Sequence, residues 1–190
     1  MGKHCYYKSK VLEYVKFFGH KEALVSAGPA TIYLSLGSNV GTREDNLARA
    51  IQLISDRMRV VKKSSVYDTA PVDIPQPRFL NMVCEVTSTL PPAGLLVLLK
   101  GIELRLGRNP GTSGLPRPID IDILLYGDTV LNTPDLTIPH SKLAEREFAL
   151  APLAEIAPDL VHPMLKKTVK EMLSAVAGKQ DVVKLRTPNA

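Results

Sequence analysis

Short stretches of the chain alternate between hydrophobic and polar residues, and longer stretches repeat hydrophobic residues at helical spacing. Apolar Ile32, Leu34 and Leu36 alternate with polar residues before a glycine, which is typical of a strand that ends in a turn. Behind Thr42, a residue type suited to begin a helix, apolar residues recur at helical spacing as far as Met58. The pattern therefore predicts a strand followed by a helix.

The rest of the chain continues in the same two patterns. Three prolines between residues 69 and 78 rule out a central strand there, so this segment is expected to be a long loop. A second loop is expected over 108–117. The other expected elements are strands over 60–69, 79–89 and 118–126, a helix over 91–107, a shorter extended segment after residues 127–128, and helices over 145–157 and 167–176.

The order strand, helix, strand, strand, helix, strand is that of a ferredoxin-like βαββαβ sandwich of the α+β class, in which helices cover an antiparallel sheet. At 190 residues the chain is long enough for one such domain with a tail at each end. Within the first tail, the spacing from Val11 to Phe18 predicts a short amphipathic helix. Many functions use this fold, so function must be sought in particular side chains.

The net charge of +5 comes from the two ends of the chain. Residues 1–30 carry five Lys against two Glu, residues 179–190 carry three basic residues against one acidic residue, and residues 31–178 carry 16 of each sign. A neutral body lacks the broad positive field that attracts a nucleic-acid backbone, and no apolar run approaches the roughly 18 residues of a membrane span. We therefore expect neither a nucleic acid nor a membrane as a partner.

The two cysteines, Cys5 and Cys84, lie in different settings and lack the spacing of a metal site. We expect both to be free thiols in a reducing compartment. The first 30 residues also lack the apolar core of a signal peptide. Together these features predict a cytoplasmic location, and a weak organelle-targeting segment within residues 1–30 stays open as an alternative, disfavoured by the absence of Arg and the presence of Glu13 and Glu22.

Asp120 and Asp122 are two residues apart on an expected strand, so both carboxylates should project from one face while the flanking isoleucines point to the other. Two negative charges held close together repel each other unless a cation lies beside them, and Mg²⁺ bound by a few carboxylates and substrate phosphates suits this arrangement. Spacing alone fits a solvated strand face with two unrelated aspartates equally well, so the neighbouring residues must decide.

Cationic residues near the two aspartates indicate phosphoryl chemistry. Arg108 and Arg117 lie at the two ends of the loop before the strand, and arginine suits phosphate oxygens through paired donors. Each arginine taken singly is more often a solvated surface residue, but together with the carboxylates they predict an enzyme that uses magnesium and a nucleoside triphosphate. We name Arg108 and Arg117 as candidate catalytic residues. His140, Arg146 and Phe148 lie in a polar stretch further along the chain.

Phe79 and Asn81 share the outer face of an expected strand, where a ring could stack on a flat heterocycle and an amide could bond its edge. An ordinary half-buried strand face explains them equally well. The turn Gly37-Ser38-Asn39 lacks the spacing of a P-loop or a dinucleotide fingerprint, so it is interpreted as a tight turn only.

Seven segments of the chain, in order, resemble the 6-hydroxymethyl-7,8-dihydropterin pyrophosphokinase family of folate biosynthesis. The resemblance covers about residues 31–176. The segments are Leu36-Gly37-Ser38-Asn39, Tyr67-Asp68-Thr69-Ala70-Pro71, Phe79-Leu80-Asn81, Ile102-Glu103, Pro116-Arg117 through Asp120-Ile121-Asp122-Ile123, Ile138-Pro139-His140 and Ile156-Ala157-Pro158-Asp159-Leu160.

This resemblance implies transfer of a diphosphate from ATP to the hydroxymethyl oxygen of the pterin, with release of AMP. It implies that Asp120 and Asp122 hold two Mg²⁺ ions against the triphosphate, and it gives no general base. The implied ATP-binding residues are Glu103, Arg108, Arg117, Ile123, Thr137, His140 and Arg146, and the implied pterin-binding residues are Gly37, Thr69, Val72, Phe79, Asn81 and Phe148, with the ring between the two phenylalanines.

The chain departs from the usual family pattern in a few places. Ser113-Gly114-Leu115 stands where the family usually has a basic residue, an aromatic residue and Gly, Ala70 stands where Pro is usual, and Asp135 stands where some members have Arg. These changes put the phosphate clamp in question. Two alternatives therefore stay open, an inactive relative that binds pterin or nucleotide and an RNA-binding ferredoxin-like module.

We expect residues 1–30 to be an N-terminal extension, residues 31–178 the catalytic domain and residues 179–190 a mobile C-terminal tail. The loops 69–78 and 108–117 are expected to close over ligands and exclude water. Pterin and ATP are the expected small-molecule partners, and a neighbouring enzyme of the folate pathway is a further candidate partner.

Overall fold

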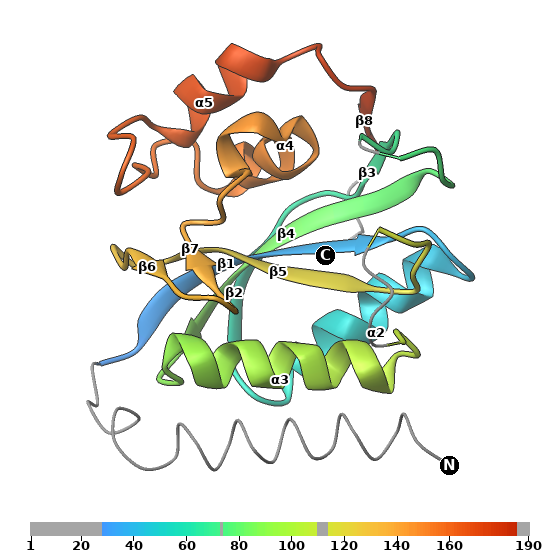
Figure 1. The fold of residues 1–190 in the computed structure, drawn as a ribbon, viewed down its shortest axis with the longest axis horizontal. Helices are drawn as coiled ribbons and strands as arrows, with labels where there is room; N and C mark the ends of the chain where they lie inside the picture. Colours follow the sequence, from blue (N-terminus) through green and yellow to red (C-terminus); the bar gives the residue numbers. More distant parts are fainter. Residues whose placement is uncertain (1–27, 73, 110–113, 186–190) are drawn as a thin grey trace.

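The fold has three layers, with a sheet in the middle (Figure 1). The computed structural model describes residues 28–72, 74–109 and 114–185. In chain order the elements are β1 (Ala30–Ser38), α2 (Arg43–Ser55), β2 (Arg59–Lys63), β3 (Tyr67–Thr69), β4 (Phe79–Ser88), α3 (Pro92–Arg105), β5 (Asp120–Tyr126), β6 (Leu131–Asn132), β7 (Thr137–Ile138), the 3₁₀ helix η1 (Leu143–Glu145), α4 (Glu147–Ile156), α5 (Val169–Val176) and β8 (Val182–Lys184).

The main sheet has the strand order β5-β1-β4-β3-β8, and β2 also pairs with β4. All of these pairings are antiparallel. Helix α2 connects β1 to β2, and α3 connects β4 to β5. The ferredoxin-like βαββαβ fold of the α+β class, predicted from the order of patterns, is therefore confirmed. Strands β6 and β7 form a separate two-stranded sheet.

The larger core lies between the sheet and helices α2 and α3, which run along one face (Figure 1). Ile32 and Leu34 of β1 are fully buried there, together with Ile54 of α2 and Leu99 of α3. Because successive strand residues point to opposite faces, the alternation that fills this core directs the other residues of β1 to the second face.

The second face of the sheet is covered along part of its length by α4, and α5 packs on the side of α4 that faces away from the sheet (Figure 1). Tyr33 and Val83 pack there with Leu150 of α4 and Met172 of α5. Further along β1, toward Ser38, the same face carries small and polar residues instead. The end of β1 toward Ser38 therefore does not contribute to the second core on this face of the sheet.

The strand expected over residues 60–69 is interrupted between β2 and β3. The backbone N–H and the hydroxyl of Ser65 both donate to Glu155 of α4, at 3.2 and 2.8 Å, and the Tyr67 hydroxyl donates to the same carboxylate at 2.8 Å. These bonds replace strand pairing at the break and tie α4 to the sheet. A partner 90 residues away cannot be seen in a local pattern, so the prediction of one continuous strand was wrong.

The mobile tail expected from residue 179 onward contributes a strand. Strand β8 pairs with β3 and extends the sheet, and Asp181 just before it forms an ion pair with Arg78 at 2.5 Å. The backbone of β3 would otherwise present unpaired groups at a sheet edge, and β8 satisfies them. The expectation of a mobile segment was therefore wrong for Val182–Lys184. The division into an extension, a catalytic domain and a tail stays a prediction.

Cys84 is a free, fully buried thiol, and burial raises its pKa to about 12. Cys5 and the helix expected from Val11 to Phe18 lie outside the described residues. Within 28–72, 74–109 and 114–185, none of the helices has the length and apolar character needed to cross a membrane.

Candidate active site

Strand register brings the candidate site residues together on one face of the sheet. Ser35 pairs with Asp122, and Gly37 pairs with Asp120 on one side and with Asn81 on the other. Residues paired across antiparallel strands have their side chains on the same face, so these five lie side by side. The isoleucine between the two aspartates is buried in the larger core on the opposite face. The predicted orientation of the two carboxylates agrees with this register.

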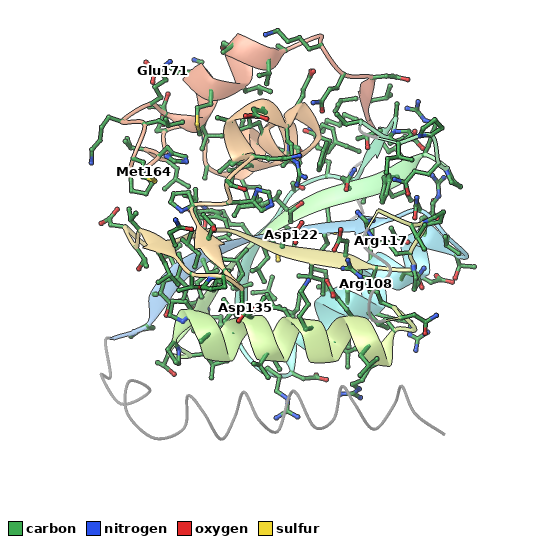
Figure 2. The ribbon with its side chains drawn as sticks, in the orientation of Figure 1. Arg108, Arg117, Asp122, Asp135, Met164 and Glu171 are labelled. Carbon is green, nitrogen blue, oxygen red and sulfur yellow. The ribbon has the colours of Figure 1, made fainter. Side chains whose placement is uncertain are left out.

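These residues form the floor of a cleft of about 440 Å³. Figure 2 shows Arg108, Arg117 and Asp122 near β5 and the segment that leads into it. The structure brings most of the predicted site residues into this one cleft. Those that line it are Gly37, Thr69, Val72, Phe79, Asn81, Arg108, Arg117, Asp120, Asp122, His140, Arg146 and Phe148.

Asp120 lies between two arginines. Its Oδ1 accepts a hydrogen bond from Arg108, and its Oδ2 lies 2.7 Å from Nη2 of Arg117. Burial alone would raise the pKa of Asp120, but the charges of Arg108 and Arg117 outweigh burial and hold the pKa below its ordinary value. Asp120 is therefore ionised at neutral pH.

Asp122 forms no comparable ion pair with the described residues around it. Burial and then the negative charge of Asp120 raise its pKa, so the folded chain disfavours the charged form. Among the residues that the structure describes, no group of three or more His, Cys, Asp or Glu side chains could hold a metal ion. Mg²⁺ fits such a pair, because it keeps several waters and takes substrate phosphates as ligands beside one or two carboxylates.

Glu103 lies beneath this cluster instead of in the cleft lining. Its Oε1 accepts hydrogen bonds from Lys100 at 2.9 Å, from Arg108 at 2.7 Å and from the backbone N–H of Ile121 at 2.7 Å. Burial raises the pKa of Glu103, although Lys100 and Arg108 oppose the shift. Glu103 therefore joins α3 to β5 and holds Arg108 in place.

Arg117 carries a donor that nothing in the described structure satisfies. Its Nε is buried and has no hydrogen-bond partner. A buried donor left unpaired costs about 1–3 kcal/mol. The same guanidinium lies 5.3 Å from the centre of the Phe79 ring, so it stands between the carboxylate cluster and the aromatic end of the cleft. An anionic oxygen bound here would satisfy the free donor.

The other end of the cleft is aromatic and amide-bearing. Asn81 donates from Nδ2 to the hydroxyl of Thr69 at 2.7 Å, and both side chains are buried. A Cβ on Gly37 would lie 2.6 Å from Oδ1 of Asn81, so this position requires glycine for close approach. Phe79 and Phe148 both line this end of the cleft, and Val72, which also lines the cleft, is 49% exposed.

His140 and Arg146 form the third side of the cleft. Nη1 of Arg146 lies 3.3 Å from Nε2 of His140, and its guanidinium carbon lies 5.5 Å from the centre of the Phe148 ring. Burial lowers the pKa of His140, although Asp122 opposes the shift. His140 is therefore neutral at physiological pH, with a ring nitrogen able to accept a hydrogen bond.

Three of the ATP-binding residues implied by resemblance do not line the cleft. Glu103 lies under it, the side chain of Ile123 is buried in the larger core, and Thr137 lies on β7, which contributes no residue to the cleft lining. For Ile123 only the backbone remains available to a ligand. Their assignment to ATP stays a prediction.

Asn39 connects the two loops that flank the cleft. Its Oδ1 accepts from the backbone N–H of Arg117 at 2.8 Å, while its Nδ2 donates to Gln76 at 3.0 Å and to the carbonyl of Pro77 at 3.2 Å. Asn39 is 3% exposed. One buried amide therefore fixes the ends of both the 69–78 and the 108–117 segments.

A sequence model described as 7,8-dihydro-6-hydroxymethylpterin-pyrophosphokinase matches residues 33–158. The chain belongs to this family. A 2-amino-4-hydroxy-6-hydroxymethyldihydropteridine pyrophosphokinase of Aquifex aeolicus is 41% identical over 143 residues, which are 75% of this chain and 89% of that protein. The family predicted from seven sequence segments is thereby confirmed.

Other members of the family are much longer proteins. The folic acid synthesis protein fol1 of Schizosaccharomyces pombe is 41% identical over 144 residues, 74% of this chain and 20% of its own length. The mitochondrial folate synthesis bifunctional protein of Arabidopsis thaliana is 42% identical over 127 residues, 66% of this chain and 23% of its own. The chain thus spans about a fifth to a quarter of these relatives.

Solved structures agree with the fold. The HPPK-DHPS protein of Plasmodium falciparum superposes with a TM-score of 0.67 over 83% of this chain and 45% of that chain, at 16% identity. At this identity the likeness bears on the fold alone. It agrees with the ferredoxin-like arrangement described above.

Sequence reasoning missed Lys100, Ser35 and Asn39. Lys100 lines the cleft, but in the sequence it only interrupts an apolar run; its position three residues before Glu103 was the available signal. Ser35 lines the cleft opposite Asp122, which follows only from the register of β1 against β5. The bonds of Asn39 to both loops depend on tertiary contacts that no local pattern reveals.

The departures from the family pattern fall at different distances from the cleft. Ala70 and Gly114 line it, whereas Leu115 is 54% exposed and outside it. Asp135 is exposed in the turn between β6 and β7 and does not line the cleft (Figure 2). Ser113 lies outside the described residues.

Proposed function

We propose that this chain transfers a diphosphate from ATP to the hydroxymethyl oxygen of 6-hydroxymethyl-7,8-dihydropterin in folate biosynthesis and releases AMP. Membership of the pyrophosphokinase family supports this activity. The observation that carries the residue-level proposal is a single cleft with a carboxylate and arginine cluster at one end and two phenylalanines with a buried amide at the other. Such a cleft suits a polyphosphate beside a flat heterocycle.

Asp120 and Asp122 would hold the magnesium, and we expect two ions there. Bound magnesium would supply positive charge that neutralises and orients the triphosphate. Burial and the charge of Asp120 raise the pKa of Asp122, so a bound cation would stabilise its charged form, and both carboxylates lie on one face of β5. These two observations support the assignment.

Arg108 and Arg117 would bind the phosphates and stabilise charge as it develops. Both guanidinium groups are already held beside Asp120, Arg108 by Glu103 as well, so they need little reorganisation on binding. The unpaired Nε of Arg117 supports a phosphate oxygen at this position. Lys100 adds a third cation to the same wall.

The pterin would bind at the aromatic end of the cleft. Phe79 and Phe148 would stack on the two faces of the ring, and the amide of Asn81 would bond its polar edge, with Gly37, Thr69 and Val72 around it. The bond from Asn81 to Thr69 fixes the amide before the ligand arrives. The remaining implied ATP contacts are Glu103, Ile123, Thr137, His140 and Arg146.

In the proposed step, the hydroxymethyl oxygen attacks the β-phosphorus of ATP in line with the leaving oxygen. The new bond joins that oxygen to the β-phosphorus, the bond from the β-phosphorus to the bridging oxygen breaks, and AMP leaves with that oxygen. The hydroxyl proton passes to solvent. Phosphoryl transfer through a loose transition state asks little of a base, so positioning and charge neutralisation dominate.

The proposal also includes a partner enzyme and a cellular location for this chain. The names of the plant relatives describe bifunctional folate synthesis proteins, and we propose that this chain works beside a neighbouring enzyme of the same pathway. We also propose a cytoplasmic location, supported by the buried free thiol of Cys84.

Incubation with ATP, Mg²⁺ and 6-hydroxymethyl-7,8-dihydropterin tests the activity, with Asp122→Ala as the control. AMP and pterin diphosphate are the expected products. Formation of ADP would indicate an ordinary kinase, and ligand binding without turnover would identify an inactive relative. The RNA-binding alternative is not favoured, because α4, with α5 packed behind it, covers part of the sheet face on which such modules stack bases.

A further inference from the structure

The segment that follows α5 contacts both the helix and the sheet that border the aromatic end of the cleft. Residues 178–184 (the C-terminal strap) run from the end of α5 to the edge of β3 (Figure 1). On the way they bond to the first turn of α4 and to both ends of the loop between β3 and β4. The strap lies beyond residues 33–158, which match the family model, so its contacts are the guide to its role.

The side chain of Gln180 caps the start of α4. Its Oε1 accepts a hydrogen bond from the backbone N–H of Phe148 at 3.3 Å, and its Nε2 donates to the backbone carbonyl of Glu145 at 3.0 Å. The first N–H groups of a helix have no partner within the helix, and the cap residue Arg146 makes no side-chain hydrogen bond to them. Gln180 therefore supplies, from 32 residues away, a partner that the local sequence lacks.

A buried carboxylate holds the strap from the α4 side. Oε1 of Glu147 accepts from the backbone N–H of Gly178 and Oε2 from that of Gln180, both at 3.0 Å, and Glu147 is buried. Gly178 has a φ of +75°, a left-handed conformation that favours glycine, and it turns the chain just after α5. Hydrogen bonds to a charged group are roughly twice as strong as neutral ones. The strap and the start of α4 are therefore joined by four hydrogen bonds.

The turn of α4 that the strap holds carries two residues of the cleft. Phe148 and Arg146 both line it, and the guanidinium carbon of Arg146 lies 5.5 Å from the centre of the Phe148 ring. Phe148 is only partly buried against the second core, so packing fixes it less firmly than a core residue. Gln180 bonds the backbone on both sides of Arg146. The position of the Phe148 ring therefore depends on the Gln180 amide.

The next residues of the strap bond to the sheet side of the cleft. The backbone carbonyl of Asp181 accepts from the N–H of Ala70 at 3.0 Å, and Val182 pairs with Thr69 across the edge of β3. Ala70 and Thr69 line the cleft, as Phe148 does. Because adjacent residues of one short segment hold both sides, the strap sets their spacing.

We propose that Gln180 is a positioning residue for pterin binding that acts through Phe148, and that the C-terminal strap fixes the spacing of α4 and β3 at the aromatic end of the cleft. The inference rests on the proposed function, in which the pterin ring stacks on Phe148. The carboxylate and arginine cluster at the other end is held by its own ion pairs and by Glu103. Loss of the strap contacts should therefore affect pterin more than ATP.

Gln180→Met tests this role, because methionine keeps the length of the side chain and removes both of its hydrogen bonds. Calorimetry of the full chain measures binding of a nonhydrolysable ATP analogue with Mg²⁺, and then binding of 6-hydroxymethyl-7,8-dihydropterin with that analogue at saturation. The affinity for pterin should fall about 3- to 10-fold, the effect of losing one neutral hydrogen bond, and that for the analogue should change less than about twofold. The backbone N–H of Phe148 should also exchange faster.

Two further variants separate positioning from overall stability. Thr168→Ala removes the capping box at the start of α5, so it lowers stability without altering a strap contact or the cleft lining, and both affinities should stay those of the wild type. Glu147→Gln leaves the Gln180 side chain in place but replaces one of the two acceptor oxygens with an NH₂ donor. It should weaken pterin binding in the same way as Gln180→Met.

Two results would overturn the inference and leave the proposed function standing. One is wild-type pterin affinity in folded Gln180→Met and Glu147→Gln. The other is an equal loss of affinity for pterin and for the ATP analogue in these variants, which would indicate a general loss of stability. If the wild-type chain itself bound no pterin under these conditions, the proposed function would fail, and the inference with it.

Discussion

Gly37→Ala is the substitution whose effect on the cleft can be worked out most directly. The new Cβ would lie 2.6 Å from Oδ1 of Asn81, closer than carbon and oxygen can approach, so the amide must move. Gly37 is not in the left-handed region, and the backbone itself tolerates alanine. The perturbation is therefore confined to the Asn81 amide and its 2.7 Å bond to Thr69.

The size of the effect follows from that one bond. Loss of a buried hydrogen bond costs about 0.5–1.5 kcal/mol, and about 1–3 kcal/mol if the partner is left unsatisfied. At about 1.4 kcal/mol for each tenfold change, a displaced amide should weaken pterin binding by about 5- to 150-fold. The affinity for ATP should stay unchanged, because Asp120 and the arginines are untouched.

Calorimetric titration of Gly37→Ala with 6-hydroxymethyl-7,8-dihydropterin, and separately with a nonhydrolysable ATP analogue and Mg²⁺, measures both affinities. Gly101→Ala is the matched control, since its new Cβ meets nothing within 4 Å and alanine stabilises a helix by up to about 1 kcal/mol. Unchanged pterin affinity in folded Gly37→Ala, or equal loss of pterin and ATP affinity, would refute the reasoning.

Three other substitutions test separate parts of the structure. Asp122→Asn should lower Mg²⁺-dependent turnover at least about 100-fold yet raise the metal-free melting temperature, because it removes a repelled charge; a lowered melting temperature would contradict this. Asn39→Ala should lower kcat more than it raises either KM, with faster hydrogen exchange at Arg117, and unchanged exchange there would argue against bridging of the loops. Glu155→Gln should destabilise the fold at pH 7 in chemical denaturation. Burial alone would raise the pKa of Glu155, but hydrogen bonds from Ser65 and Tyr67 outweigh burial and lower it. The difference in free energy of unfolding between wild type and Glu155→Gln should therefore shrink as the pH falls below the ordinary pKa of 4.5. A difference that does not change with pH would count against this hydrogen-bond network.

The sequence was sufficient for the parts of the fold and site that depend on local periodicity. The alternation of apolar and polar residues in β1 and β5 predicted that Ile121 lies in a core and that Asp120 and Asp122 share the other face of the sheet. The strand register agrees with this prediction. Period-2 and helical patterns also gave the element order. These signals work because side-chain direction is a property of the local backbone.

Contacts between distant segments escaped the same reasoning. The break between β2 and β3 depends on Glu155, and β8 forms because the edge of β3 accepts it. Asn39 looked like a turn residue because its partners, Gln76 and Arg117, lie 37 and 78 residues away. Ile123 was assigned to ATP by resemblance alone, and its side chain proves to be buried in the larger core.

Strand β5 serves the interior and the ligand at once. Ile119, Ile121 and Ile123 fill the larger core, while Asp120 and Asp122, between them on the same backbone, face the cleft. A change in side-chain volume at Ile121 would tilt the strand and move both carboxylates. Efforts to engineer thermostability should therefore avoid this strand and begin at exposed residues of α5, Lys170, Ser174 and Ala175, which belong to neither core.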